Sequence, residues 1–110
     1  MILFKEVERQ REFEKLHHKL QIILLDFEAV VMTRFQRPIV ITSMYRPEDK
    51  DSVHAYWRGC DVALIPDVDN EALRKEMNET FPYGDGKHDT IPPLMHEGST
   101  APHFHLQVHA

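Results

Sequence analysis

Two histidines and one aspartate define a candidate metal site in this chain. His54 and Asp61 lie seven residues apart, and His105 follows near the end of the sequence. Two imidazoles and one carboxylate are a natural ligand set for Zn²⁺, and a catalytic site keeps a fourth position for water or substrate. The residue types therefore suggest an open zinc centre, although eight histidines in 110 residues allow many accidental triplets.

The segment that carries His105 is predicted to be a β-strand with two different faces. Polar and apolar residues alternate from position 103 to position 109, and alternate residues of a strand point to opposite sides. The polar face would hold His103, His105, Gln107 and His109, and the apolar face Phe104, Leu106 and Val108. One face would then belong to the core and the other to the site. For His103 and His109, a solvated strand face is an alternative interpretation.

The residues around Asp61 also predict a strand. Positions 60–65 are apolar except for Asp61, and a buried carboxylate is costly unless it is paired or bound to a metal. Asp61 should therefore have a partner. Cys60 is the single cysteine, which excludes an internal disulfide, and its apolar surroundings favour a buried thiol over a reactive one.

Several motifs together resemble the M15 peptidases, the group of D-alanyl-D-alanine carboxypeptidases and phage endolysins whose fold the hedgehog signalling domain shares. The resemblance covers about residues 39–109 and rests on the segment 41–46, Ser52, His54, Asp61, and the pair His103 and His105. In this family the ligands are the His and Asp of a Ser-x-His-x-x-Gly-x-Ala-x-Asp motif and a late His. The resemblance implies that His54, Asp61 and His105 bind zinc.

The same resemblance implies roles for further residues. Tyr45 and Arg46 match a Tyr-Arg pair that follows the first strand, in which the arginine holds a substrate carbonyl or carboxylate. A surface ion pair of Arg46 with Glu48 or Asp49 is the alternative. His103 would sit beside the metal without binding it.

Two departures from the family pattern concern the active site. Trp57 stands where the motif has Gly, and Gly59 where it has Ala. Pro102 occupies the position of the catalytic acid, about three residues before the last ligand. Glu97 or His103 could substitute as the proton carrier, since each is close to the ligands in the sequence. For Trp57 and Tyr56, a pocket wall and core packing are both possible interpretations.

Length and composition set broad limits. A chain of 110 residues fits one domain, here residues 1–110, with a single core. The formal net charge of −5 disfavours nucleic acid as a partner. Charged residues directly follow Met1–Phe4, so we expect no signal peptide. No apolar run is long enough to span a membrane. We therefore expect synthesis in the cytoplasm and a separate export route for any role at the cell wall. The oligomeric state is left open.

The remaining pattern predicts an α+β fold of the hedgehog/DD-peptidase kind, with a long N-terminal helix on a small antiparallel sheet. An apolar stripe predicts a helix from Phe13 to Arg37, where Pro38 ends it, with His17 and His18 as solvated residues without a chemical role. The other predicted elements are a strand at 39–43, a helix at 71–80, a loop at 81–93 and a short strand at 94–96.

These predictions lead to two alternative functions. The first is a zinc-dependent peptidase that acts on peptidoglycan stem peptides, of the kind found in phages and prophages. The second is a catalytically weakened or inactive metal-binding module that binds cell-wall peptides or uses zinc structurally. A general base within reach of the metal-bound water would distinguish them.

Overall fold

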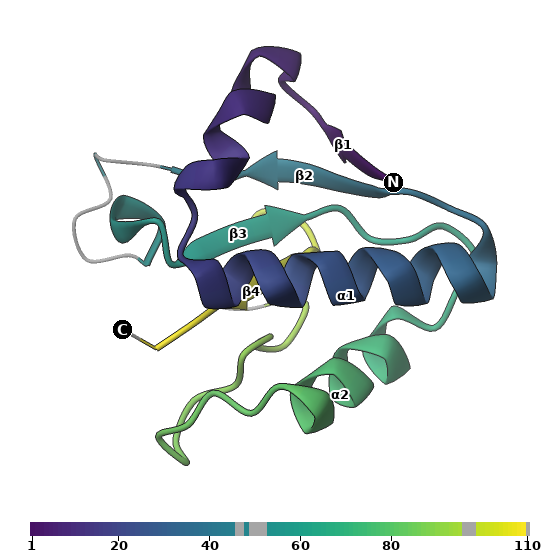
Figure 1. The fold of residues 1–110 in the computed structure, drawn as a ribbon. Coiled ribbons are helices and arrows are strands. Elements are labelled where there is room, and N and C mark those ends of the chain that lie inside the picture. The colour runs from purple at the N-terminus through teal and green to yellow at the C-terminus, as the bar shows by residue number, and fades with distance from the viewer. Residues whose placement is uncertain (46–47, 49–52, 96–98, 110) are drawn as a thin grey trace.

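The structure is a computed structural model that describes residues 1–45, 48, 53–95 and 99–109, with residues 54 and 55 described by their backbone (Figure 1). Helices and strands are mixed along the chain, which confirms the predicted α+β class. The elements are β1 (Ile2–Phe4), the 3-10 helix η1 (Val7–Lys15), α1 (His18–Phe35), β2 (Ile39–Ser43), the 3-10 helix η2 (Val53–Tyr56), β3 (Gly59–Val62), α2 (Asn70–Thr80) and β4 (Phe104–Gln107).

In the described part of the chain, four strands form one sheet in the order β1-β2-β3-β4. The pairs β2-β3 and β3-β4 are antiparallel, as predicted, but β1 runs parallel to β2, with Ile2 opposite Ile39. The prediction of an antiparallel sheet is therefore wrong for this pair, and the sheet is mixed. The connection explains the difference, because η1 and α1 together form the long crossover that a parallel pair requires.

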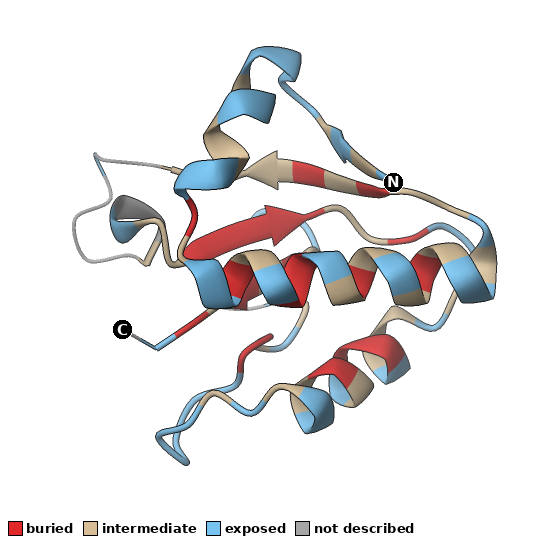
Figure 2. Ribbon diagram, in the orientation of Figure 1, coloured by how far each residue is buried: buried red, intermediate tan, exposed pale blue. Residues whose placement is uncertain are grey.

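Helix α1 covers one face of the sheet (Figure 1). Its inner side is buried and its outer side is exposed, as the colours of Figure 2 show. The buried side chains are Leu20, Ile23, Leu24, Phe27 and Val31, which are spaced at three and four residues. The ring centroids of Phe27 and Phe104 lie 5.1 Å apart in an edge-to-face arrangement, which joins the helix to β4.

The start of α1 differs from the prediction. The apolar stripe suggested a helix from Phe13, but Phe13 lies in η1 and the α-helix begins at His18. Leu16 and His17 are extended, and the His17 N–H donates to the Trp57 carbonyl at 2.8 Å. His17 also caps the helix, because its Nδ1 accepts the Lys19 N–H at 3.2 Å. Burial and the neighbouring cations lower the pKa of His17, which favours the neutral ring that this cap needs.

Helix α2 begins within one residue of the predicted position. The Asp69 side chain accepts the Ala72 N–H at 3.0 Å, which is an ordinary N-cap. Near the end of the helix, Asn78 clamps the following loop through both backbone groups of Ile91, at 2.7 and 2.8 Å. The predicted loop at 81–93 is confirmed, since no helix or strand forms there.

The predicted strand at 94–96 is not formed at Leu94 and Met95, which lie in bends, and His96 lies outside the described residues. The His103 N–H donates to the Leu94 carbonyl at 3.0 Å, so the two segments do meet. Pro92 and Pro93 have no N–H to extend this contact into a ladder. Among the described residues, no helix is both long and apolar enough to cross a bilayer.

Candidate functional site

Asp61 lies in β3, where all four residues are buried. Its neighbours in the sheet are Ser43 on β2 and His105 on β4. Only 8% of Asp61 is exposed, so its carboxylate has lost most of its hydration and requires polar partners. The predicted burial of Asp61 in a strand is thus confirmed, but the strand ends at Val62 and does not extend to residue 65 as predicted.

His105 is the first of these partners. Its Nδ1 lies 2.9 Å from Asp61 Oδ1, between residues that are 44 positions apart in the sequence. The sheet register sets this distance, because Asp61 and His105 are directly opposite each other on adjacent antiparallel strands. The strand alternation was also predicted correctly, since Phe104, Leu106 and Val108 are buried, whereas His105 is only partly so.

His103 approaches the same carboxylate oxygen. Its Nε2 lies 3.6 Å from Asp61 Oδ1, and its Nδ1 lies 3.0 Å from the carbonyl of Ala101. One face of the sheet therefore brings two imidazoles to one buried carboxylate. Of the predicted site residues, the structure places Asp61, His103 and His105 together.

The hydrogen-bonding pattern of His105 fits a cation at this position. Its Nδ1 faces the Asp61 carboxylate, and its Nε2 lies 3.3 Å from Gln107 Oε1. The amide nitrogen of Gln107 donates to the Asp89 carbonyl at 2.9 Å, which turns the amide oxygen toward His105. Both ring nitrogens thus face oxygens, and a metal ion bound to one of them would be compatible with this arrangement. The sequence analysis placed Gln107 on this face but gave it no role.

Other predicted site residues lie outside what the structure describes. This applies to Arg46, to Glu97 and to the side chain of His54, whose backbone belongs to η2. Within the described residues, no three His, Cys, Asp or Glu side chains are arranged to hold a metal ion. The candidate centre consequently rests on Asp61 and His105, with the third ligand still a prediction. Pro102 is exposed and lies just before β4.

Trp57 has an unusual backbone conformation between η2 and β3. Its φ of 61° lies in the left-handed region, which costs a residue with a side chain about 1–2 kcal/mol and is adopted freely by glycine. Its ring stacks on Tyr45 with centroids 4.2 Å apart and an interplanar angle of 1°. Trp57 also packs against the core, so the core-packing interpretation is the better one. Tyr56 is 58% exposed and lies under the Arg58 guanidinium.

Cys60 precedes Asp61 in β3 and is completely buried, as predicted. Burial, and next the charge of Asp61, raise the pKa of the Cys60 thiol well above its usual value. A protonated, inaccessible thiol is a poor nucleophile and a poor metal ligand. Cys60 therefore acts as a core residue.

Protein-family models, curated proteins and solved structures all gave no match to this chain.

Proposed function

We propose that this chain is a zinc-binding domain similar to the M15 peptidases, acting on peptidoglycan stem peptides. The observation that carries the proposal is the pairing of the buried Asp61 with His105 across β3 and β4. Two residues that the family motif implies as ligands are far apart in the sequence and adjacent in space. A carboxylate and an imidazole are also suitable zinc ligands.

The conformation of Trp57 gives the proposal independent support. The family motif has Gly at this position, and the φ of 61° is one that glycine adopts without strain. A turn in this conformation is compatible with the glycine of the motif, although this chain carries a bulky residue there. The turn lies directly between the backbone of His54 in η2 and the strand that holds Asp61.

The residues would divide the chemistry as follows. His54, Asp61 and His105 would hold the metal, and bound Zn²⁺ supplies the polarisation of a scissile carbonyl and the activation of water. His103 would carry a proton between water and the leaving amine, since its Nε2 already lies near the Asp61 carboxylate. Arg46 would pair with a carboxylate or carbonyl of the peptide. Glu97 is the second candidate proton carrier.

A second function has its own supporting observation. Pro102 stands where the resemblance expects the catalytic acid, and proline cannot transfer a proton. A domain that binds zinc and cell-wall peptides without cleaving them would tolerate this residue. The two functions differ in turnover and share the metal site.

Metal analysis and mass spectrometry test both proposals. Protein dialysed with Zn²⁺ should hold one metal per chain, and His54→Ala, Asp61→Ala and His105→Ala should lose it, whereas the exposed His88→Ala serves as the matched control. Full stoichiometry in all three ligand variants would refute the site.

Zinc-loaded protein is then incubated with purified peptidoglycan and short stem peptides. Cleavage that disappears in His103→Ala or Glu97→Gln while zinc stays bound supports the peptidase. Cleavage that survives both substitutions would refute their role as proton carriers. Peptide binding without cleavage would favour the binding module.

A further inference from the structure

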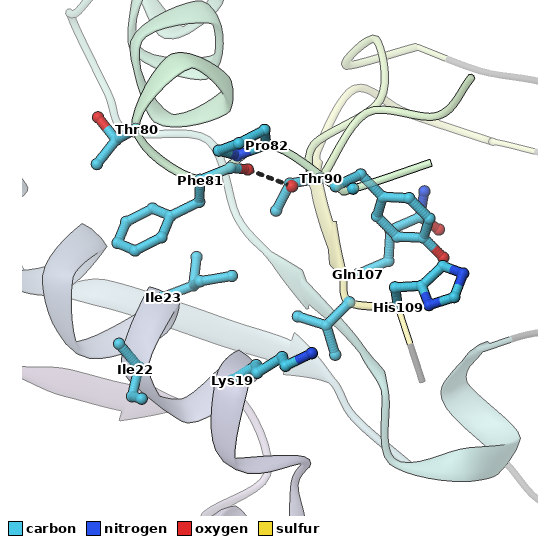
Figure 3. Close-up of a pocket in the computed structure, with 12 residues that line it drawn as sticks. Lys19, Ile22, Ile23, Thr80, Phe81, Pro82, Thr90, Gln107 and His109 are labelled. Atoms are coloured by element: carbon cyan, nitrogen blue, oxygen red, sulfur yellow. Dashed lines mark hydrogen bonds between the residues drawn. The ribbon is translucent and has the colours of Figure 1, made fainter. Parts of the chain in front are cut away.

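A cavity of about 410 Å³ lies between α1, the loop that follows α2, and the end of β4 (Figure 3). Its walls are mostly apolar and include Ile22, Ile23, Phe81 and Val108. The volume is in the range that small organic ligands occupy in proteins. The cavity is separate from the Asp61 carboxylate, which does not line it.

The wall of the cavity formed by α1 contains an exposed apolar residue. Ile22 is 56% exposed, although the next residue, Ile23, is buried. The Thr90 hydroxyl donates to the Phe81 carbonyl on the opposite wall, which ties the two ends of the loop together (Figure 3). Asn78 fixes Ile91 next to this bond, so the loop side of the cavity is held in place.

Among the described residues that line the cavity, Lys19 carries the one formal charge. Lys19 lines it and extends from α1 toward the end of β4, where Gln107 and His109 lie (Figure 3). No aspartate or glutamate is among the lining residues, although the chain as a whole has a net charge of −5. The carboxylate of nearby Asp89 lies 3.7 Å from Arg74 Nη1. Within the described residues, Lys19 has no carboxylate within ion-pair distance.

We propose that this cavity binds a small organic anion with an apolar body, namely a short aliphatic carboxylate. The Lys19 ammonium pairs with the carboxylate, and Ile22, Ile23 and Phe81 surround the hydrocarbon part. A ligand this small, held by one charge-assisted contact, should bind with a Kd of about 1 mM.

The proposed site does not depend on zinc. Gln107 lines the cavity and also contacts His105, so the cavity and the candidate metal centre share one side chain. Binding can nevertheless be measured on metal-free protein. Failure of this proposal and failure of the zinc proposal are therefore separate results.

Methyl NMR of the metal-free, 110-residue chain tests the proposal with isocaproate as the probe and isocaproamide as its uncharged match. Isocaproate should shift the methyl signals of Ile22 and Ile23 in a saturable way and leave those of Ile39 and Ile41, buried in the sheet, unchanged. The amide should bind about tenfold more weakly, because it cannot pair with an ammonium.

Two substitutions with matched controls locate the binding. Lys19→Met keeps most of the length of the side chain and removes its charge. It should weaken isocaproate binding about tenfold, to the level of the amide, whereas Lys75→Met on α2 should have no effect. Ile22→Asp should abolish binding by placing a carboxylate on the wall. The control is Leu25→Asp, because Leu25 also lies on α1, is 52% exposed and does not line the cavity. This variant should bind isocaproate as the unsubstituted protein does.

Three results would overturn the proposal. The first is equal affinity for acid and amide, or unchanged binding in Lys19→Met. The second is the lack of any saturable shift up to about 10 mM probe. The third is a dependence of the Ile22 and Ile23 signals on protein concentration without probe, which would place a second copy of the chain in the cavity.

Discussion

Two of the aspartate–histidine pairs among the described residues have opposite surroundings. His105 Nδ1 lies 2.9 Å from Asp61 Oδ1 inside the sheet, and His88 Nδ1 lies 2.6 Å from Asp85 Oδ2 in the loop after α2. The first pair joins residues 44 positions apart and is largely buried, whereas the second spans three positions and is exposed. Similar distances therefore do not imply similar energies, because solvent screens the second pair.

The backbones that carry the two pairs differ as well. The loop of Asp85 uses Gly84 and Gly86 at positive φ, and nothing lies within 4 Å of a Cβ placed on either glycine. The segment before Asp61 places Trp57 in a similar conformation and packs its ring against Tyr45. The exposed pair thus sits on an unstrained local turn. The buried pair follows a strained turn that tertiary packing stabilises.

Substitution of the aspartate should give the largest difference in stability between the two pairs. Asp61→Ala should lower the free energy of unfolding of metal-free protein by about 3 kcal/mol, because His105 then loses its buried partner. Asp85→Ala should lower the same free energy by much less, because solvent screens the hydrogen bonds of the exposed carboxylate. Chemical denaturation of both variants measures the difference. Equal destabilisation would show that burial does not distinguish the two pairs.

Zinc should stabilise the protein through one pair alone. At about 100 times its Kd, a metal that binds only the folded state adds about 2.7 kcal/mol of stability. His105→Ala should abolish the rise in melting temperature with added Zn²⁺, and His88→Ala should retain it. Differential scanning calorimetry with and without zinc gives the result. An unchanged rise in His105→Ala would exclude the buried pair as a metal centre.

The strained turn at Trp57 predicts an unusual order of stability for two variants. Trp57→Gly and Trp57→Ala both lose the stack on Tyr45, but alanine keeps the left-handed strain that glycine relieves. Trp57→Gly should therefore be more stable than Trp57→Ala by about 1 kcal/mol, whereas glycine is usually the less stable of the two. Urea denaturation compares them. The usual order would show that the φ of Trp57 is not held in solution.

The smallest expected effect is the titration of Asp85. The hydrogen bond from His88, followed by those from the backbone N–H groups of Lys87 and His88, lowers the pKa of Asp85 to about 2. Because this pKa is below its unfolded value of 3.8, any stability from the ionised group is fully present above pH 3.8 and is lost as the pH falls toward 2.

NMR titration of the Asp85 carboxyl carbon should show this low midpoint. In His88→Ala the midpoint should rise, though the backbone bonds keep it below the ordinary value. A midpoint near 3.8 in the unsubstituted protein would show that the hydrogen bond between Asp85 and His88 is not formed in solution.

The sequence alone determined the features that depend on local periodicity. Alternation predicted which face of β4 is buried, and the local sequence pattern predicted the start of α2 to within one residue. The apolar run around Asp61 predicted a buried carboxylate that needs a partner. Each of these signals lies within about ten residues, where side-chain direction follows from the strand or helix period.

Only the tertiary structure decided the features that depend on distant segments. The parallel pairing of β1 with β2 and the extended break at Leu16 and His17 arise from contacts with Ile39 and Trp57. The role of Gln107 follows from the positions of His105 and Asp89 on either side of it. The partner of Asp61 was set by strand register, because a shift of one residue would turn His105 to the opposite face of the sheet.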